Sequence, residues 1–206
     1  MADRTAVVLA GGRSTRFGDA DKAVADLGGV PMIRRVADRV APVVDALVVN
    51  CRAEQTPAVR EALSGYDHPV TVAEDDYPDE GPMAGMATGL RAVDGEYAFV
   101  VACDMPFVDA DFVAHLFERA AGYDAAVPRP DQWFETTHAV YRASAMADAC
   151  EAALADGESR IVAPLFDLDF VVVGADEVRE YGSMDTFENV NTPEDYADAR
   201  RRLGLD

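Results

Sequence analysis

Short apolar segments alternate with segments of helical periodicity through the first 120 residues, and this alternation constrains the fold most. Between two of the apolar segments, Ile33, Val36, Ala37 and Val40 recur at the spacing of one helix face. Strands that alternate with helices in this way form a largely parallel sheet with helices on both faces. The apolar segments, each predicted to be a buried strand, are Thr5–Ala10, Ala46–Asn50, Pro69–Ala73 and Tyr97–Ala102.

The second half of the chain predicts further strands at one side of the same sheet. These strands are Asp124–Val127, Thr137–Tyr141, Phe170–Val173 and Thr186–Val190. The other predicted helices are Glu54–Leu63, a helix starting within Glu80–Ala87, one around Val113–Ala120, Ala143–Ala155 and Pro193–Leu203, the last begun by a capping box of Thr192 and Asp195. We therefore expect an α/β fold, a three-layer α/β/α arrangement with a mostly parallel mixed central sheet, as a single domain over residues 1–206.

The net charge argues against partners that are held by general electrostatic attraction. Acidic residues outnumber basic residues 38 to 18, which gives a formal charge of −20. Such a surface repels phosphate backbones and anionic lipids, so we expect neither nucleic acid nor a membrane as a partner. The acidic residues are spread along the chain, which predicts adaptation to high salt, where screening weakens their repulsion.

The cysteines and the apolar segments indicate the compartment. Cys51, Cys103 and Cys150 lie far apart and form no CxxC pair, which disfavours a disulfide framework or a zinc site. The sequence shows no signal-peptide pattern and no apolar run approaching the length of a membrane span. We therefore expect a cytoplasmic protein.

Glycine, amide and carboxylate groups follow four of the predicted strands. Ligands of open α/β sheets bind at the carboxyl ends of the strands, so these residues are expected to meet at one edge. They are Gly11 and Gly12 after the first strand, Asn50 after the second, Asp75 after the third and Asp104 after the fourth.

The glycine-rich loop after the first strand is the strongest of these signals. Paired glycines let backbone N–H groups converge on an anion, and Arg16 and Lys22 add positive charge for a triphosphate. Lys22 is the one lysine of the chain, against 17 arginines, which favours a need for a compact point charge. Neither the GxxxxGK[ST] nor the GxGxxG pattern is present; the alternative is an ordinary turn between a strand and a helix.

Asp104 follows a buried strand and precedes Met-Pro, so it is expected to face the ligand crevice. Mg²⁺ binds one or two carboxylates together with phosphate oxygens and water, which makes Asp104 the candidate metal ligand. The alternative is a carboxylate that caps a helix or stabilises a loop.

Other polar and small residues allow two interpretations each. The segment Gly81–Met86, with Gly85, is suited to close approach of a flat base or to tight packing of a helix on the sheet. Asn191 could serve the site or cap a turn. His138 is expected to be packed or hydrogen-bonded rather than a catalytic base, and Trp133 to pack rather than to stack on a base.

Five segments, in order along nearly the whole chain, resemble the molybdenum cofactor guanylyltransferases of the nucleotidyltransferase superfamily. They read LAGGRSTRFGDADK, DEGPMAGM, ACDMPF, ETTHAVYR and NVNTPEDY. The chain departs from the family pattern at Thr136, where the family has proline, and near Asp19–Asp21, where one residue is added. The resemblance implies a Rossmann-like nucleotidyltransferase fold whose N-terminal part binds the nucleotide and whose C-terminal part binds the acceptor.

The resemblance also implies the roles of individual residues. The implied catalytic residues are Arg16, Lys22 and Asp104, with Asp104 as the Mg²⁺ ligand. The implied binding residues are Leu9, Ala10, Gly11 and Gly12 along the nucleotide, Arg16 and Lys22 at its phosphates, Asn50 and Asp75 at the guanosine, and Asn189 and Asn191 at the pterin acceptor.

The implied reaction joins GMP from GTP to molybdenum-molybdopterin and releases pyrophosphate, and it leaves room for transient contact with other molybdenum cofactor biosynthesis proteins. Three alternatives stay open. The first is the same chemistry with cobinamide phosphate, 2-phospholactate or CTP; the second is a nucleotide-binding regulator without catalysis. The third, a nicotinamide dehydrogenase, is disfavoured because its glycine fingerprint is missing.

Overall fold

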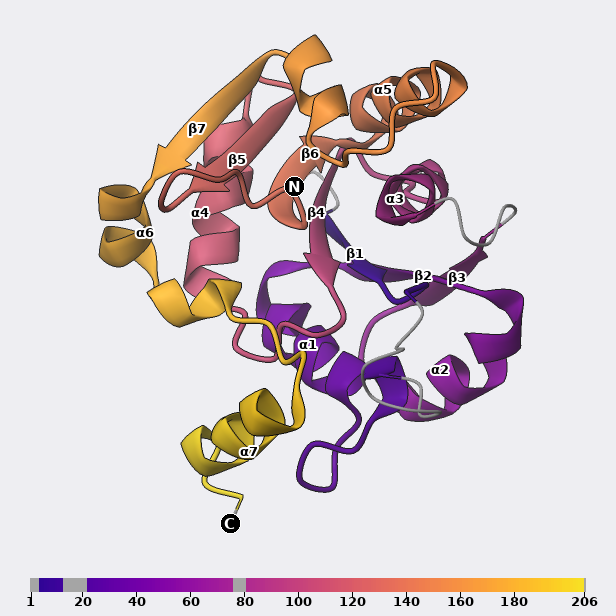
Figure 1. Ribbon diagram of the computed structural model, residues 1–206, viewed down its shortest axis with the longest axis vertical. Coiled ribbons are helices and arrows are strands. Elements are labelled where there is room, and N and C mark those ends of the chain that lie inside the picture. The colour runs from indigo at the N-terminus through magenta and orange to yellow at the C-terminus, as the bar shows by residue number, and fades with distance from the viewer. Residues whose placement is uncertain (1–3, 13–21, 76–80, 206) are drawn as a thin grey trace.

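A mixed sheet forms the centre of the computed structural model, which describes residues 4–12, 22–75 and 81–205. In these residues the sheet has seven strands in the order β3-β2-β1-β4-β6-β5-β7 (Figure 1). Strand β6 is antiparallel to β4 and β5, and the other pairs are parallel. The predicted fold class is confirmed. The strands are β1 Arg4–Leu9, β2 Ala46–Cys51, β3 Val70–Glu74, β4 Tyr97–Ala102, β5 Ala125–Arg129, β6 His138–Arg142 and β7 Phe170–Gly174.

Helices cover both faces of the sheet. One face is covered by α1 Met32–Val40, α2 Thr56–Ala62, α4 Ala110–Ala120 and α6 Ala175–Tyr181, and the other by α3 Pro82–Arg91 and α5 Ala143–Ala155. Helix α7 Pro193–Arg202 lies apart from the sheet, beyond α1 (Figure 1). No helix among the described residues is long and apolar enough to cross a membrane. The 3-10 helices are η1 Lys22–Val24, η2 Ala41–Val43, η3 Ala53–Gln55, η4 Ala163–Asp167 and η5 Met184–Phe187.

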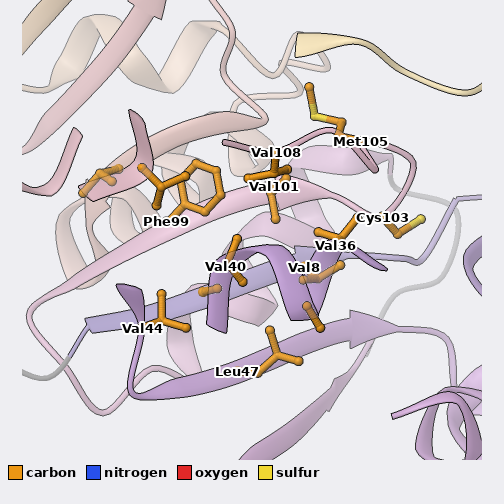
Figure 2. Packing of buried hydrophobic residues seen from close by; sticks show 14 of the residues in the cluster. Val8, Val36, Val40, Val44, Leu47, Phe99, Val101, Cys103, Met105 and Val108 are labelled. Atoms are coloured by element: carbon orange, nitrogen blue, oxygen red, sulfur yellow. The ribbon is translucent and has the colours of Figure 1, made fainter. Parts of the chain in front are cut away.

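Alternating side chains of the strands supply two cores, one on each face. Val8 packs on the α1 side with Val36 and Val40, as Figure 2 shows, whereas Val7 belongs to the core under α3. This is the period-two pattern of a strand that is buried on both faces. Each fully buried side chain of this size contributes about 1.5–3 kcal/mol, so the central strands form a rigid support for the loops at their carboxyl ends.

The predicted strand Thr186–Val190 is wrong. Met184–Phe187 forms the 3-10 helix η5, and Ser183 accepts a hydrogen bond from the backbone N–H of Asp185 at its start. The segment does not run alongside a strand, so its apolar residues pack without a ladder of hydrogen bonds. We call residues 182–192, which lead from α6 to α7, the C-terminal strap.

One helix was not predicted from the sequence, and one further expectation differs from the structure. Helix α6 was missed because Val178 is its one buried side chain, too few for a helical period to show. Trp133 was expected to pack, but 68% of its surface is exposed, since it lies in the connection between β5 and β6.

Candidate active site

The loops at the carboxyl ends of the central strands are held side by side by backbone hydrogen bonds. The N–H of Ala10 donates to the carbonyl of Asn50 (2.8 Å), and the N–H of Cys103 donates to the carbonyl of Leu9 (3.1 Å). These bonds continue the parallel pairing of β1 with β2 and β4 beyond the last paired residues. Residues from separate strand ends therefore meet at one edge, as the sequence predicted.

Two glycines leave room for a pair of polar side chains at this edge; we call Gly11, Gly85, Asn50 and Asp75 the glycine cradle. The Asn50 side chain is buried and its Nδ2 donates to Asp75 Oδ1 at 2.6 Å. A Cβ at Gly11 would lie 2.5 Å from Asp75 Oδ2, and one at Gly85 would lie 2.4 Å from Asn50 Oδ1. At both distances a Cβ would force the Asp75 or Asn50 side chain to move, so glycine at these positions lets the pair keep its arrangement.

Gln55 supports the cradle and was not predicted. It is 9% exposed, its Nε2 donates to the carbonyl of Ala10 (3.1 Å), and its Oε1 accepts from the N–H of Arg52 (2.9 Å). The signal that could have found it is Gln three residues after Arg52 at a helix start, the spacing of a capping box. Gln55 fixes the backbone that the resemblance assigns to the nucleotide.

The second group of site residues is Lys22, Asp104 and Asn191, which we call the phosphate cluster. Lys22 Nζ lies 2.5 Å from Asp104 Oδ2 and donates to Asn191 Oδ1 at 2.7 Å. The Lys22 and Asp104 side chains are 13% and 16% exposed, so their charges are only partly screened by water. The predicted meeting of the one lysine and the strand-end carboxylate is thus present in the structure.

Asp104 has an unused oxygen at this site. Its Oδ1 is buried and has no hydrogen-bond partner in the described part of the chain, and a buried carboxylate oxygen in that state is costly. In the same residues, no group of three or more His, Cys, Asp or Glu side chains is placed to hold a metal. One carboxylate that shares its ion with phosphate oxygens and water fits Mg²⁺, so the residues present fit that ion.

Not every predicted site residue joins these two groups. Asn189 is exposed and donates to the carbonyl of Phe187 (3.3 Å), and it lines a separate groove of about 460 Å³ together with Phe107 and Glu194. Gly12 is exposed, with open space where a Cβ would lie. Arg16 lies outside the described residues.

His138 is a packed histidine, as the sequence predicted. It is fully buried, its ring contacts those of Phe99 and Phe187, and its Nε2 is hydrogen-bonded to Thr186 Oγ1 at 3.1 Å. Burial lowers the pKa of His138 to about 3, so the ring is neutral near pH 7 and is no base for the reaction.

The fold and the groups at its strand ends define a nucleotidyltransferase. Residues 6–169 match the family described as the MobA-like NTP transferase domain, and the chain belongs to this family. A relative from Natronomonas pharaonis, named "Probable molybdenum cofactor guanylyltransferase", is 53% identical over 98% of this chain and 100% of its own. A relative of the same name from Haloferax mediterranei is 41% identical over 93% of this chain and 90% of its own.

A solved structure and the source of the relatives agree with this assignment. The crystal structure of molybdopterin-guanine dinucleotide biosynthesis protein A from Archaeoglobus fulgidus is 30% identical, with a TM-score of 0.80 over 98% of this chain and 100% of that one. The relatives from Natronomonas and Haloferax belong to halophiles, which supports the halophilic adaptation that the charge of −20 predicts.

Proposed function

We propose that the chain transfers GMP from GTP to molybdenum-molybdopterin, forming molybdopterin guanine dinucleotide and pyrophosphate. The names of the relatives support the reaction. The observation that carries the proposal is the phosphate cluster, in which an ammonium group is paired with a carboxylate whose second oxygen has no partner in the described chain. The glycine cradle at the same sheet edge holds a polar pair that a Cβ at Gly11 or Gly85 would displace. This arrangement serves a polyphosphate and its counter-ion at one end and a base and ribose at the other.

In the proposed reaction, an oxygen of the acceptor phosphate attacks the α-phosphorus of GTP. The new phosphorus–oxygen bond forms as the bond to the bridging oxygen of the β-phosphate breaks, and pyrophosphate carries away the electron pair. The acceptor phosphate is already an anion near pH 7, so no general base is needed. Catalysis rests on in-line positioning and on stabilising the charge that develops.

Lys22 and Asp104 have distinct parts in this reaction. The Lys22 ammonium group would stabilise the negative charge that grows on the leaving pyrophosphate. Asp104 would hold Mg²⁺ through Oδ1, and Mg²⁺ when bound supplies charge neutralisation to phosphate oxygens. Asn191 orients the Lys22 ammonium through its Oδ1, and we place Arg16 at the phosphates as well.

The other site residues would bind the nucleotide and the acceptor. Asn50 and Asp75 would contact the guanosine, with the backbone of residues 9–12 and Gly85 against the nucleotide. The C-terminal part of the chain, including Asn191 and Asn189, would face the pterin. We place the reaction in the cytoplasm, in keeping with three buried cysteines that are free thiols.

A pyrophosphate-release assay tests the proposal. GTP, CTP and ATP are each combined with molybdopterin, cobinamide phosphate and 2-phospholactate, with and without Mg²⁺. We expect release from the pair of GTP and molybdopterin, dependent on Mg²⁺. A preference for another pair would reassign the acceptor or the base, and binding of GTP without release under every condition would show a regulator instead.

A further inference from the structure

The C-terminal strap brings Asn191 to the phosphate cluster from the far end of the sequence. It is attached at Thr186, whose Oγ1 accepts from the N–H of Asp109 at 3.0 Å, and at Val190, whose N–H donates to the carbonyl of Asp104 at 2.8 Å. The second bond joins the strap to the residue that carries the candidate metal-binding carboxylate. Small shifts of the strap would therefore be transmitted to the cluster.

Asp195 holds the end of the strap. Its Oδ2 accepts from the N–H of Asn191 at 2.9 Å and from the N–H of Thr192 at 2.8 Å. The side chain of Asn191 in turn accepts from Lys22 Nζ at 2.7 Å. Asp195 therefore reaches the Lys22 ammonium group through Asn191: it holds the backbone N–H of Asn191, and the side chain of Asn191 contacts Lys22.

The charge of Asp195 has a further effect on the cluster. Hydrogen bonds from the backbone of Asn191 and from Thr192 lower the pKa of the Asp195 carboxyl, and attraction to Lys22 lowers it further. The carboxylate is therefore ionised near pH 7 and acts on the same ammonium group that Asp104 pairs with.

We propose that Asp195 is a positioning residue for the reaction, which fixes Asn191 against Lys22 from the start of α7. The inference rests on the proposed function. Capping alone accounts for the reciprocal bonds within the box, in which Thr192 Oγ1 accepts from the N–H of Asp195 at 3.1 Å and Oδ2 accepts from that of Thr192. Capping does not require the bond from the N–H of Asn191, because Asn191 precedes the capping residue Thr192 and belongs to the phosphate cluster.

Two variants of the same capping box separate a positioning role from a purely structural one. Thr192→Ala removes the Oγ1 cap of α7 and keeps the Asp195 carboxylate on Asn191. Asp195→Ala does the reverse: it removes the carboxylate that accepts from the N–H groups of Asn191 and Thr192, and it keeps the Oγ1 cap, which accepts from the backbone N–H of residue 195. Loss of a residue that orients an active-site group lowers activity about 10- to 100-fold. We expect Asp195→Ala to lower kcat by about tenfold or more, with KM for GTP changed less than about twofold. Thr192→Ala is expected to keep the kcat of the wild type.

Asp195→Asn and a double variant protect the test against a folding artefact. The asparagine has nearly the same shape and keeps an amide oxygen that can accept from the N–H groups of Asn191 and Thr192, so it should fold as the wild type and restore most of the kcat that Asp195→Ala loses. Combined with Asn191→Ala, Asp195→Ala should add less than about twofold, because residues that act through one another are not additive. Full additivity, or an equal loss of kcat in Thr192→Ala and Asp195→Ala at equal loss of Tm, would overturn the inference.

A readout without turnover keeps this test separate from that of the proposed function. The sequence contains one lysine, so lysine labelled with ¹³C at Cε gives a single signal, that of Lys22. We expect Asp195→Ala to move this signal, Asp195→Asn to move it less, and Thr192→Ala to leave it in place. If the wild type releases no pyrophosphate, the proposed function fails while the signal still decides on Asp195; an unmoved signal would reject the positioning role.

Discussion

The glycine cradle and the phosphate cluster lie at the same sheet edge but are built by different means. In the cradle, the positions of Gly11 and Gly85 are decided by space, because any Cβ would overlap the side chains of Asp75 or Asn50. In the phosphate cluster, Lys22 and Asp104 are held by opposite charge at 2.5 Å. Shape therefore governs the first region, and electrostatics governs the second.

The two regions also differ in how much of the chain they need. The cradle uses strand ends and α3 from the first half, packed on the central core. The phosphate cluster joins Lys22 to Asn191, 169 residues away in sequence, through the C-terminal strap. We infer that substitutions in the cradle act mainly on nucleotide binding, whereas those in the cluster act mainly on turnover.

Lys22→Ala should have the largest effect. It removes the ammonium group that stabilises charge on the leaving group, and the loss of one such preorganised donor costs about 10²- to 10³-fold in kcat. Pyrophosphate release measures the loss, and thermal unfolding checks that the variant folds. Lys22→Arg keeps the charge but presents a planar guanidinium in place of a compact ammonium group. We therefore expect its kcat to be little higher than that of Lys22→Ala. Near-normal turnover in Lys22→Ala would refute the assignment.

Asp104→Asn should have the next largest effect. It keeps the shape of the side chain but weakens both the pairing with Lys22 and the proposed hold on Mg²⁺. We expect kcat to fall about 10- to 100-fold and more Mg²⁺ to be required for half-maximal rate. A titration of Mg²⁺ in the pyrophosphate-release assay measures this; wild-type activity at low Mg²⁺ would exclude Asp104 as the ligand.

Gly85→Ala tests the steric side of the comparison. The new Cβ would meet Asn50 Oδ1 at 2.4 Å and displace a side chain that is bonded to Asp75. We expect KM for GTP to rise about tenfold with little change in kcat, and an overpacking cost of about 1–3 kcal/mol in stability. Steady-state kinetics and thermal unfolding measure both.

Gly89→Ala is the matched control for Gly85→Ala. It places a Cβ in the same helix, 2.6 Å from Val7 Cγ1 in the core and 3.4 Å from Asn50 Cβ, so it touches the base of the Asn50 side chain and not its polar end. It should lower stability to a similar degree and leave KM for GTP close to that of the wild type. Equal KM in the two variants would mean that the cradle does not bind the nucleotide.

The parts of this comparison that lie at strand ends could be predicted from the sequence. Apolar strands such as Tyr97–Ala102 are short, and parallel strands end at one edge, so Asp104 and Asn50 were expected there. Lys22 could be predicted because it is the one lysine of the chain and follows the glycine loop.

The supporting contacts could not be predicted. Gln55 acts through the carbonyl of Ala10, and Asp195 through the N–H of Asn191; backbone groups carry no residue-specific signal in a sequence. Part of the strap was mistaken for a strand because Thr186, Phe187 and Val190 are residue types that favour strands, although Thr186 uses its hydroxyl as an anchor. Local patterns thus located the reactive groups but not what holds them.

The smallest effect on turnover is expected from His138→Gln, at the anchor of the strap. Gln is neutral and can keep a hydrogen bond to Thr186, so we expect turnover near pH 7 within about twofold of the wild type, since the partner of Thr186 is retained. Its effect should appear in stability at low pH instead. The pKa of His138 is lowered by burial to about 3 in the folded protein, against about 6.5 in an unfolded chain.

The sign of this pH effect follows from proton binding. Between pH 6.5 and about 3 the unfolded state binds a proton that the folded state does not, so stability is lost as the pH falls through this window. At pH 5 this histidine should cost the wild type about 2 kcal/mol relative to neutral pH. The free energy of unfolding of both proteins is measured with denaturant at pH 7 and pH 5. Subtracting the wild-type value from that of the variant cancels the pH effect of the carboxylates that the two proteins share. The difference between them should shift by that amount in favour of His138→Gln, and parallel pH profiles would show that His138 is not held neutral in the fold.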